Sequence, residues 1–109
     1  MQEDFELLGD VTVIGKAEEI TALIDGFIPN VPEDMRPLIR RPSYDPETEL
    51  IAMGNLYGGK HSVNAGALPR IKALRTQLRD YGTVDALRKL LESDPTMWVN
   101  FNGYTRWRP

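Results

Sequence analysis

The residues best suited to binding chemistry in this sequence are basic side chains near aromatic ones. Three basic residues follow helical spacing within 68–81, namely Lys72, Arg75 and Arg79, and Arg70 flanks the apolar stripe of the same segment. Near the C-terminus, Arg106 and Arg108 alternate with Trp107. Cations beside aromatic rings bind phosphates and unstacked bases, so this pattern permits a single-stranded nucleic-acid or phosphate-binding site. Two observations oppose it: outward-facing basic residues also keep an amphipathic helix soluble, and the isoelectric point is near 5.1.

Residues for nucleophilic or metal-assisted catalysis are scarce. His61 is the single histidine and the chain has no cysteine, which excludes histidine-pair and thiolate metal sites. A serine–histidine–aspartate arrangement would need Ser43, Ser62 or Ser93 beside His61, and none lies in a nucleophile-elbow motif. The acidic residues form neither a calcium loop nor an H-E-x-x-H helix. We therefore predict no enzymatic activity, no metal and no cofactor.

A glycine-rich segment at 54–61, GNLYGGKH, matches most of the pattern G-x-x-x-x-G-K-[ST]. It resembles the phosphate-binding loop of the P-loop nucleotide-binding family. The resemblance implies that backbone N–H groups and Lys60 would contact nucleotide phosphates. It is confined to this segment, and His61 stands where the family has the hydroxyl residue that binds Mg²⁺. An ordinary turn at Gly58 and Gly59 also accounts for the pattern.

Charge is unevenly distributed along the chain. Residues 1–50 carry twelve acidic and four basic residues, whereas 51–109 carry four acidic and nine basic residues, within a net charge of −3. The two halves could neutralise each other across one fold. Alternatively, an acidic surface would be steered towards a basic groove on another protein. The second reading suggests a small regulatory or inhibitory protein of the type carried by phages and mobile elements.

Length and composition fit one folded domain spanning residues 1–109. Of the residues, 41% are apolar and 27% are charged, which is typical of a chain that buries a core. No apolar run approaches the roughly 20 residues that cross a bilayer. The first four residues include two acidic and no basic side chains, unlike a secretory signal. We expect a cytoplasmic protein that does not interact with membranes.

The N-terminal half predicts a strand, a helix and an irregular connection. β-branched residues at 11–14, between Gly9 and Gly15, predict the strand, and apolar spacing predicts a helix at about 17–24. Five prolines within 28–46 exclude a long helix there, leaving room for one turn at 34–39. Residues 46–57 fit either a short helix capped by Asp45 or a buried strand. We favour the strand.

The C-terminal half predicts two helices. An apolar stripe predicts an amphipathic helix at 68–81. Thr83 then provides the N-cap of another helix, with Val84, Leu87, Leu90 and Leu91 facing inward. Because only two residues separate these helices, we expect a tight helical hairpin.

An aromatic β-hairpin is predicted at 98–107. Asn102 and Gly103 suit a type I′ turn, and this turn would place Trp98 opposite Trp107. An exposed tryptophan pair would form a contact for a partner protein or for a second copy of the chain.

These observations predict an α+β fold: a small mostly antiparallel sheet with helices packed on one face and a C-terminal β-hairpin. The predicted core is Val11, Val13, Ile20, Leu23, Phe27, Ile51, Ile71, Leu74, Leu78, Leu87, Leu90, Val99 and Phe101. The leading functional hypothesis is a non-enzymatic protein-binding module, and the alternative is a single-stranded nucleic-acid or phosphate-binding protein. The predicted binding residues are Tyr57, Lys60, Arg70, Lys72, Arg75, Arg79, Trp98, Tyr104, Arg106 and Trp107.

Overall fold

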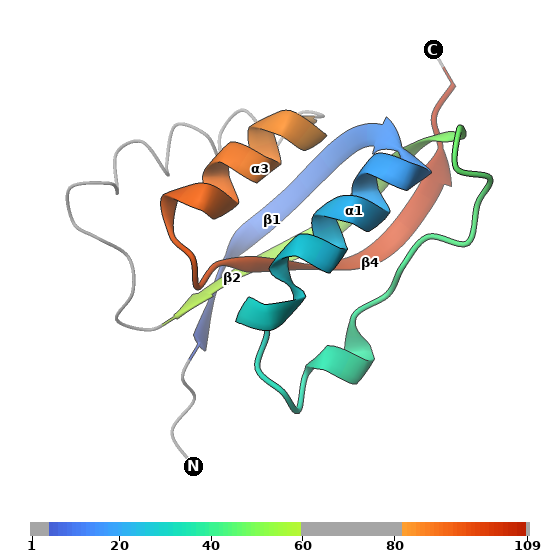
Figure 1. Cartoon of the computed structure of the whole chain (residues 1–109). Coiled ribbons are helices and arrows are strands. Elements are labelled where there is room, and N and C mark those ends of the chain that lie inside the picture. The colour runs from blue at the N-terminus through green and yellow to red at the C-terminus, as the bar shows by residue number, and fades with distance from the viewer. Residues whose placement is uncertain (1–4, 60–81, 109) are drawn as a thin grey trace.

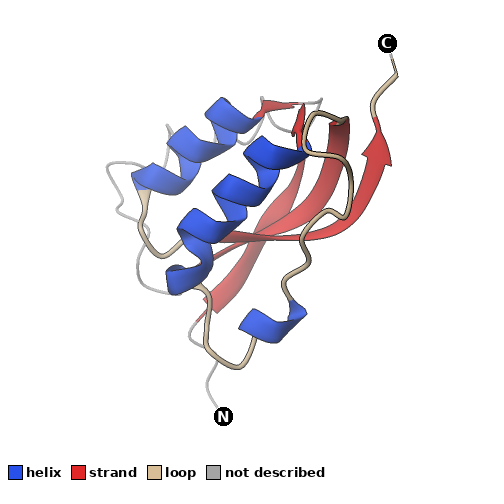
Figure 2. Cartoon of the chain, turned by 45° about the vertical axis from the view of Figure 1, so that its right-hand side comes forward, coloured by secondary structure: helices blue, strands red, loops and turns tan. Residues whose placement is uncertain are grey.

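A computed structural model describes residues 5–59 and 82–108, and these form an α+β arrangement. Four strands make one mixed sheet in the order β3-β1-β2-β4. The strands are β1 (Phe5–Lys16), β2 (Glu49–Gly59), β3 (Gly82–Thr83) and β4 (Trp98–Arg106). Two helices, α1 (Ala17–Phe27) and α3 (Val84–Ser93), lie side by side on one face of this sheet (Figures 1 and 2). The predicted fold class and the placement of these helices are therefore confirmed.

The antiparallel pair β1 and β2 forms the centre of the sheet. Pairing runs from Lys16 opposite Glu49 to Phe5 opposite Gly59. It is interrupted between Leu7 and Gly9, where Gly9 has a φ of 142° that side chains with a Cβ rarely adopt. The strand predicted at 11–14 is confirmed and extends further in both directions, because its partner strand supplies hydrogen bonds beyond the β-branched run.

Each helix follows a strand directly and begins with a side chain that satisfies a free N–H group. The Glu19 carboxylate accepts from the backbone N–H of Lys16 at 3.2 Å, and the Thr83 hydroxyl accepts from the backbone N–H of Ala86 at 3.1 Å. The predicted Thr83 cap and the two helices starting at residues 17 and 84 are thus confirmed. The helix predicted at 68–81, and with it the helical hairpin, lies outside the described residues.

Residues 49–59 form a strand, which confirms the alternative that we favoured for 46–57. Its register corrects one predicted core residue: Leu50, Ala52 and Leu56 are fully buried beneath the helices, while Ile51 lies on the opposite face. Gly54 is required for close packing, because a Cβ there would lie 2.7 Å from the Asn100 carbonyl oxygen.

The predicted C-terminal β-hairpin is wrong. Residues 98–106 form one continuous strand, β4, which pairs with β2 along its length. Asn102 lies at a shift in register, between the pairs that Phe101 and Gly103 make with β2. Eight residues of β2, from Leu50 to Tyr57, pair with β4, which is more backbone pairing than a hairpin closed on itself would provide. Tertiary pairing therefore overrides the local preference of Asn-Gly for a turn.

The proline-rich connection packs beside α1. It contains two short 3₁₀ helices, Ile28–Asn30 and Arg36–Leu38, and the second confirms the turn predicted at 34–39. Val31 is buried, and Met35 and Ile39 pack partly against the core. The Tyr104 hydroxyl donates to the Arg40 carbonyl at 2.9 Å, which fastens this connection to β4.

The core lies between the helices and the inner face of the sheet. Its buried residues are Val11, Val13, Ala17, Ile20, Leu23, Ile24, Phe27, Val31, Leu50, Ala52, Leu56, Val84, Leu87, Leu90, Leu91, Met97, Trp98, Val99 and Phe101. Of the predicted core residues, Ile71, Leu74 and Leu78 lie outside the described part of the chain. Within the part that is described, no helix is both long and apolar enough to cross a bilayer.

Candidate functional site

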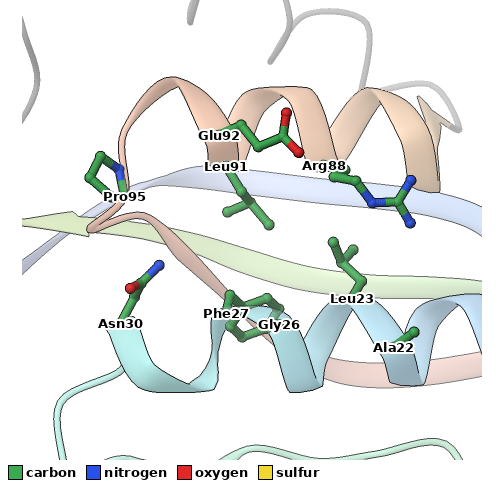
Figure 3. A pocket seen from close by; sticks show the side chains of 9 residues that line it. All are labelled: Ala22, Leu23, Gly26, Phe27, Asn30, Arg88, Leu91, Glu92 and Pro95. Carbon is green, nitrogen blue, oxygen red and sulfur yellow. The ribbon is translucent and has the colours of Figure 1, made fainter.

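A groove of about 520 Å³ separates α1 from α3 on the outer side of the helix layer. Its base is apolar, since Leu23, Phe27 and Leu91 are each less than a tenth exposed. The full lining is Ala22, Leu23, Gly26, Phe27, Asn30, Arg88, Leu91, Glu92 and Pro95 (Figure 3). Leu23 and Leu91 point towards each other from the two helices. The base of the groove is therefore formed by apolar side chains that are themselves largely covered.

Small residues on α1 keep the groove open. Ala22 and Gly26 lie four residues apart and so share one side of the helix. A Cβ built on Gly26 meets no atom within 4 Å, which shows that this wall borders free space. Gly is also about 1 kcal/mol less favourable than Ala inside a helix. Larger residues here would fill the groove without disturbing the core.

Charged side chains line the groove only on the α3 side. Arg88 and Glu92 are four residues apart and project along that edge (Figure 3). Arg88 also contacts Asp85 at 3.3 Å, and Lys89 contacts the same carboxylate at 3.5 Å. The α1 side contributes apolar residues and the amide of Asn30. The groove is thus apolar inside and charged along one margin.

A second, smaller hollow of about 340 Å³ lies between α1 and the proline-rich connection. It is lined by Ala17, Glu18, Thr21, Ala22, Asp25, Pro42, Tyr44 and Pro46. An ion pair between Arg41 and Asp25 at 2.7 Å joins the connection to α1. This hollow therefore follows from how the connection packs on α1.

The predicted tryptophan pair does not form. Trp98 lies opposite Tyr57 of β2, is 1% exposed, and stacks on the Tyr57 ring with centroids 4.7 Å apart. Phe5 packs edge-on against both rings, at 6.1 Å from Trp98 and 5.8 Å from Tyr57. The sequence predicted Trp98 at the surface because a hairpin would have turned it outward. Pairing with β2 instead makes it part of an aromatic cluster, which removes it from any contact surface.

Only some of the other predicted binding residues lie in the described part of the chain. Lys60, Arg70, Lys72, Arg75 and Arg79 lie outside the described residues. Trp107 is partly exposed, and its backbone N–H donates to the Glu49 carbonyl at 2.9 Å. Arg106 is exposed at the end of β4. Tyr104 is half-buried, and burial raises its pKa to about 12, an effect that Arg40 partly offsets. The described members of the predicted set do not converge on one site.

Part of the acidic character of the first half is neutralised within that half. Lys16 and Glu47 form an ion pair at 3.1 Å, and the hydrogen bond from Lys16 to this carboxylate raises the pKa of Lys16. Together with the pair of Arg41 and Asp25, this contact places two of the four basic residues against acidic neighbours. Both pairs lie within residues 1–50, so the excess of acidic residues in that half is unchanged.

The glycine-rich segment is a strand rather than a loop over its first six residues. Residues 54–59 belong to β2 and pair with β1, so their backbone hydrogen-bonding groups serve the sheet. Lys60 and His61 are outside the described range, as is Ser62. The Ser93 hydroxyl donates to the Lys89 carbonyl at 3.0 Å. Among the described residues, no three histidine, cysteine or acidic side chains gather in a way that could hold a metal ion.

Comparison with known proteins gives no matching family model, no matching curated sequence and no matching solved structure. Of the two hollows described above, the groove between α1 and α3 is the larger. Sequence reasoning missed it because two helices far apart in the chain form it. The available signal was weak: Ala22 is a small residue in the helix predicted at 17–24, and Gly26 lies just beyond the predicted end of that helix.

Proposed function

We propose that this protein is a non-enzymatic protein-binding module that receives a helix of a partner protein in the groove between α1 and α3. The observation that carries the proposal is the groove of about 520 Å³ between the two helices, with Leu23, Phe27 and Leu91 at its base. Amphipathic helices bind in grooves of this kind through apolar side chains spaced three to four residues apart. Because α1 and α3 rest on the sheet, the groove is held open before a partner arrives.

The chemistry of the groove indicates moderate affinity. Each leucine-sized side chain that a partner buries contributes roughly 1.5–3 kcal/mol. Association itself costs a comparable or larger amount through lost translational and rotational freedom. We therefore expect dissociation constants on the order of micromolar. A small module of this strength fits a regulatory or inhibitory role in the cytoplasm, a location that agrees with the absence of cysteine from the sequence.

The absence of cysteine from the sequence also allows a clean experiment. Asn30→Cys places a single thiol at the end of the groove, and Leu38→Cys places one on the exposed 3₁₀ helix Arg36–Leu38 as a matched control. Each variant carries a thiol-linked photocrosslinker and is exposed to an extract of the source organism. We expect a defined adduct from Asn30→Cys and none from Leu38→Cys.

Two further substitutions test whether the groove itself makes the contact. Gly26→Leu fills the groove, whereas Gly26→Ala adds one methyl group in open space. In the Asn30→Cys background, Gly26→Leu should abolish the adduct and Gly26→Ala should retain it. An adduct that survives Gly26→Leu, or forms equally well from Leu38→Cys, would show that the groove is not the docking site.

No described contact favours the alternative function, binding of single-stranded nucleic acid or phosphate. It stays a prediction that rests on basic residues at 60–79, outside the described range. A fluorescent single-stranded oligonucleotide tests it: affinity should fall steeply as salt is added if phosphates make the contacts. Lack of binding at low salt would eliminate this alternative.

A further inference from the structure

The charged margin of the groove has a definite direction. Arg88 comes before Glu92 on α3, and both line the same edge. The facing side of α1 contributes no charged residue to the lining. A partner helix lying in the groove would therefore meet one positive and one negative side chain, in a fixed order and about one helical turn apart.

The two helices that form the groove run in the same direction. β1 and β3 are parallel, and each is followed at once by its helix: Ala17 follows Lys16, and Val84 follows Thr83. The dipoles of α1 and α3 therefore point the same way (Figures 1 and 3). A third helix between them is favoured in the antiparallel orientation, because its negative C-terminal end then lies beside their positive N-terminal ends.

We propose that the occupant of the groove is an amphipathic helix, antiparallel to α1 and α3, in which a basic residue is followed four positions later by an acidic one. The order follows from the geometry. In an antiparallel helix, the residue opposite Glu92 comes first and must be basic, and the residue opposite Arg88 comes one turn later and must be acidic. A parallel helix would need the reverse order. This inference rests on the proposed function, because it specifies the partner of the same groove.

Arg88 and Glu92 are both able to form ion pairs with such a partner helix. Glu92 makes no ion pair with the other described residues. Arg88 contacts Asp85, but that pair is solvent-exposed on both sides and therefore weak. A guanidinium carries five N–H donors, so Arg88 can hold Asp85 and a partner carboxylate together. Lys89 also contacts Asp85, which keeps that carboxylate paired if Arg88 turns towards the partner.

Two synthetic helical peptides of identical composition test the inference. Both carry the same apolar stripe, but one has lysine four residues before glutamate and the other has glutamate four residues before lysine. Fluorescence anisotropy at low ionic strength measures their affinity for the full chain. We expect the lysine-first peptide to bind about tenfold more tightly, because two exposed ion pairs replace two like-charge contacts.

The double variant Arg88→Glu with Glu92→Arg preserves net charge and should reverse the preference. Glu6→Lys is the control: it changes a charge at an exposed position on β1, and Glu6 does not line the groove, so the preference should persist. Gly26→Leu should eliminate binding of both peptides.

The outcomes separate the two proposals. Equal binding of both peptides that is lost in Gly26→Leu would overturn the charge order and leave the groove as the docking site. Tighter binding of the glutamate-first peptide would overturn the antiparallel orientation. Peptide binding that Gly26→Leu does not affect would contradict both the inference and the proposed function.

Discussion

Gly54→Ala is a direct test of how β4 packs against β2. A Cβ at Gly54 would lie 2.7 Å from the Asn100 carbonyl oxygen and 3.0 Å from the Phe101 Cα, and both atoms belong to the backbone of β4. Ordinary contacts of this kind are several tenths of an ångström longer. Backbone held in a ladder cannot move as freely as the end of a side chain, so β4 must shift away from β2 or lose pairing.

The expected destabilisation is about 1–3 kcal/mol, the range for overpacking a well-packed core. For a domain of this size each 1 kcal/mol changes the melting temperature by about 4–8 °C, so Gly54→Ala should lower it by roughly 10 °C. Gly26→Ala is the matched control, because its Cβ meets no atom within 4 Å. It should raise stability by up to about 1 kcal/mol through helix propensity.

Thermal unfolding followed by circular dichroism, together with urea titrations, measures both variants. An unchanged melting temperature for Gly54→Ala would refute the pairing of β4 with β2 at this point. It would also reopen the possibility that residues 98–107 fold back on themselves as a hairpin.

Three further predictions concern the aromatic residues and the turn after α3. The pKa of Tyr104 is about 12 in the folded state and 10 in the unfolded state, so the unfolded state loses its proton first as the pH rises. The free energy of unfolding should therefore fall between pH 10 and 12. Urea titrations across this range should show a smaller fall in the free energy of unfolding for Tyr104→Phe than for the natural chain. Acrylamide should quench the fluorescence weakly in a variant that keeps only Trp98 and more strongly in a variant that keeps only Trp107, because Trp98 is 1% exposed. Equal quenching in the two variants would contradict the burial of Trp98. Asp94 is buried and accepts from the Thr96 backbone N–H at 2.9 Å and hydroxyl at 2.7 Å, so Asp94→Ala should cost about 1–3 kcal/mol in denaturant unfolding. Asp94→Asn keeps an acceptor for both donors and should cost less, and equal losses for the two variants would contradict a role for these hydrogen bonds.

The sequence predicted the local elements correctly wherever a short run of residues favours one structure without help from distant segments. The β-branched run at 11–14 predicted a strand, and the Thr83 hydroxyl predicted the start of α3. The prolines at 28–46 predicted irregular structure with one turn at 34–39, where Arg36–Leu38 forms a 3₁₀ helix, but they did not predict the second 3₁₀ helix, Ile28–Asn30. Each of these features depends on neighbours within a few residues, and the structure confirms each of them.

Tertiary contacts decided the features that depend on segments far apart in the chain. Asn102 and Gly103 favour a turn, but the hydrogen-bonding edge of β2 makes them part of a strand, which buries Trp98 against Tyr57. The groove exists because two helices separated by more than fifty residues rest side by side on one sheet. Sequence by itself determined where α1 and α3 begin and part of the apolar interior: Val11, Val13, Ile20, Leu23, Phe27, Leu87, Leu90, Val99 and Phe101. Which surfaces remain open was decided only when the strands paired, because exposure depends on the whole packed arrangement rather than on local preference.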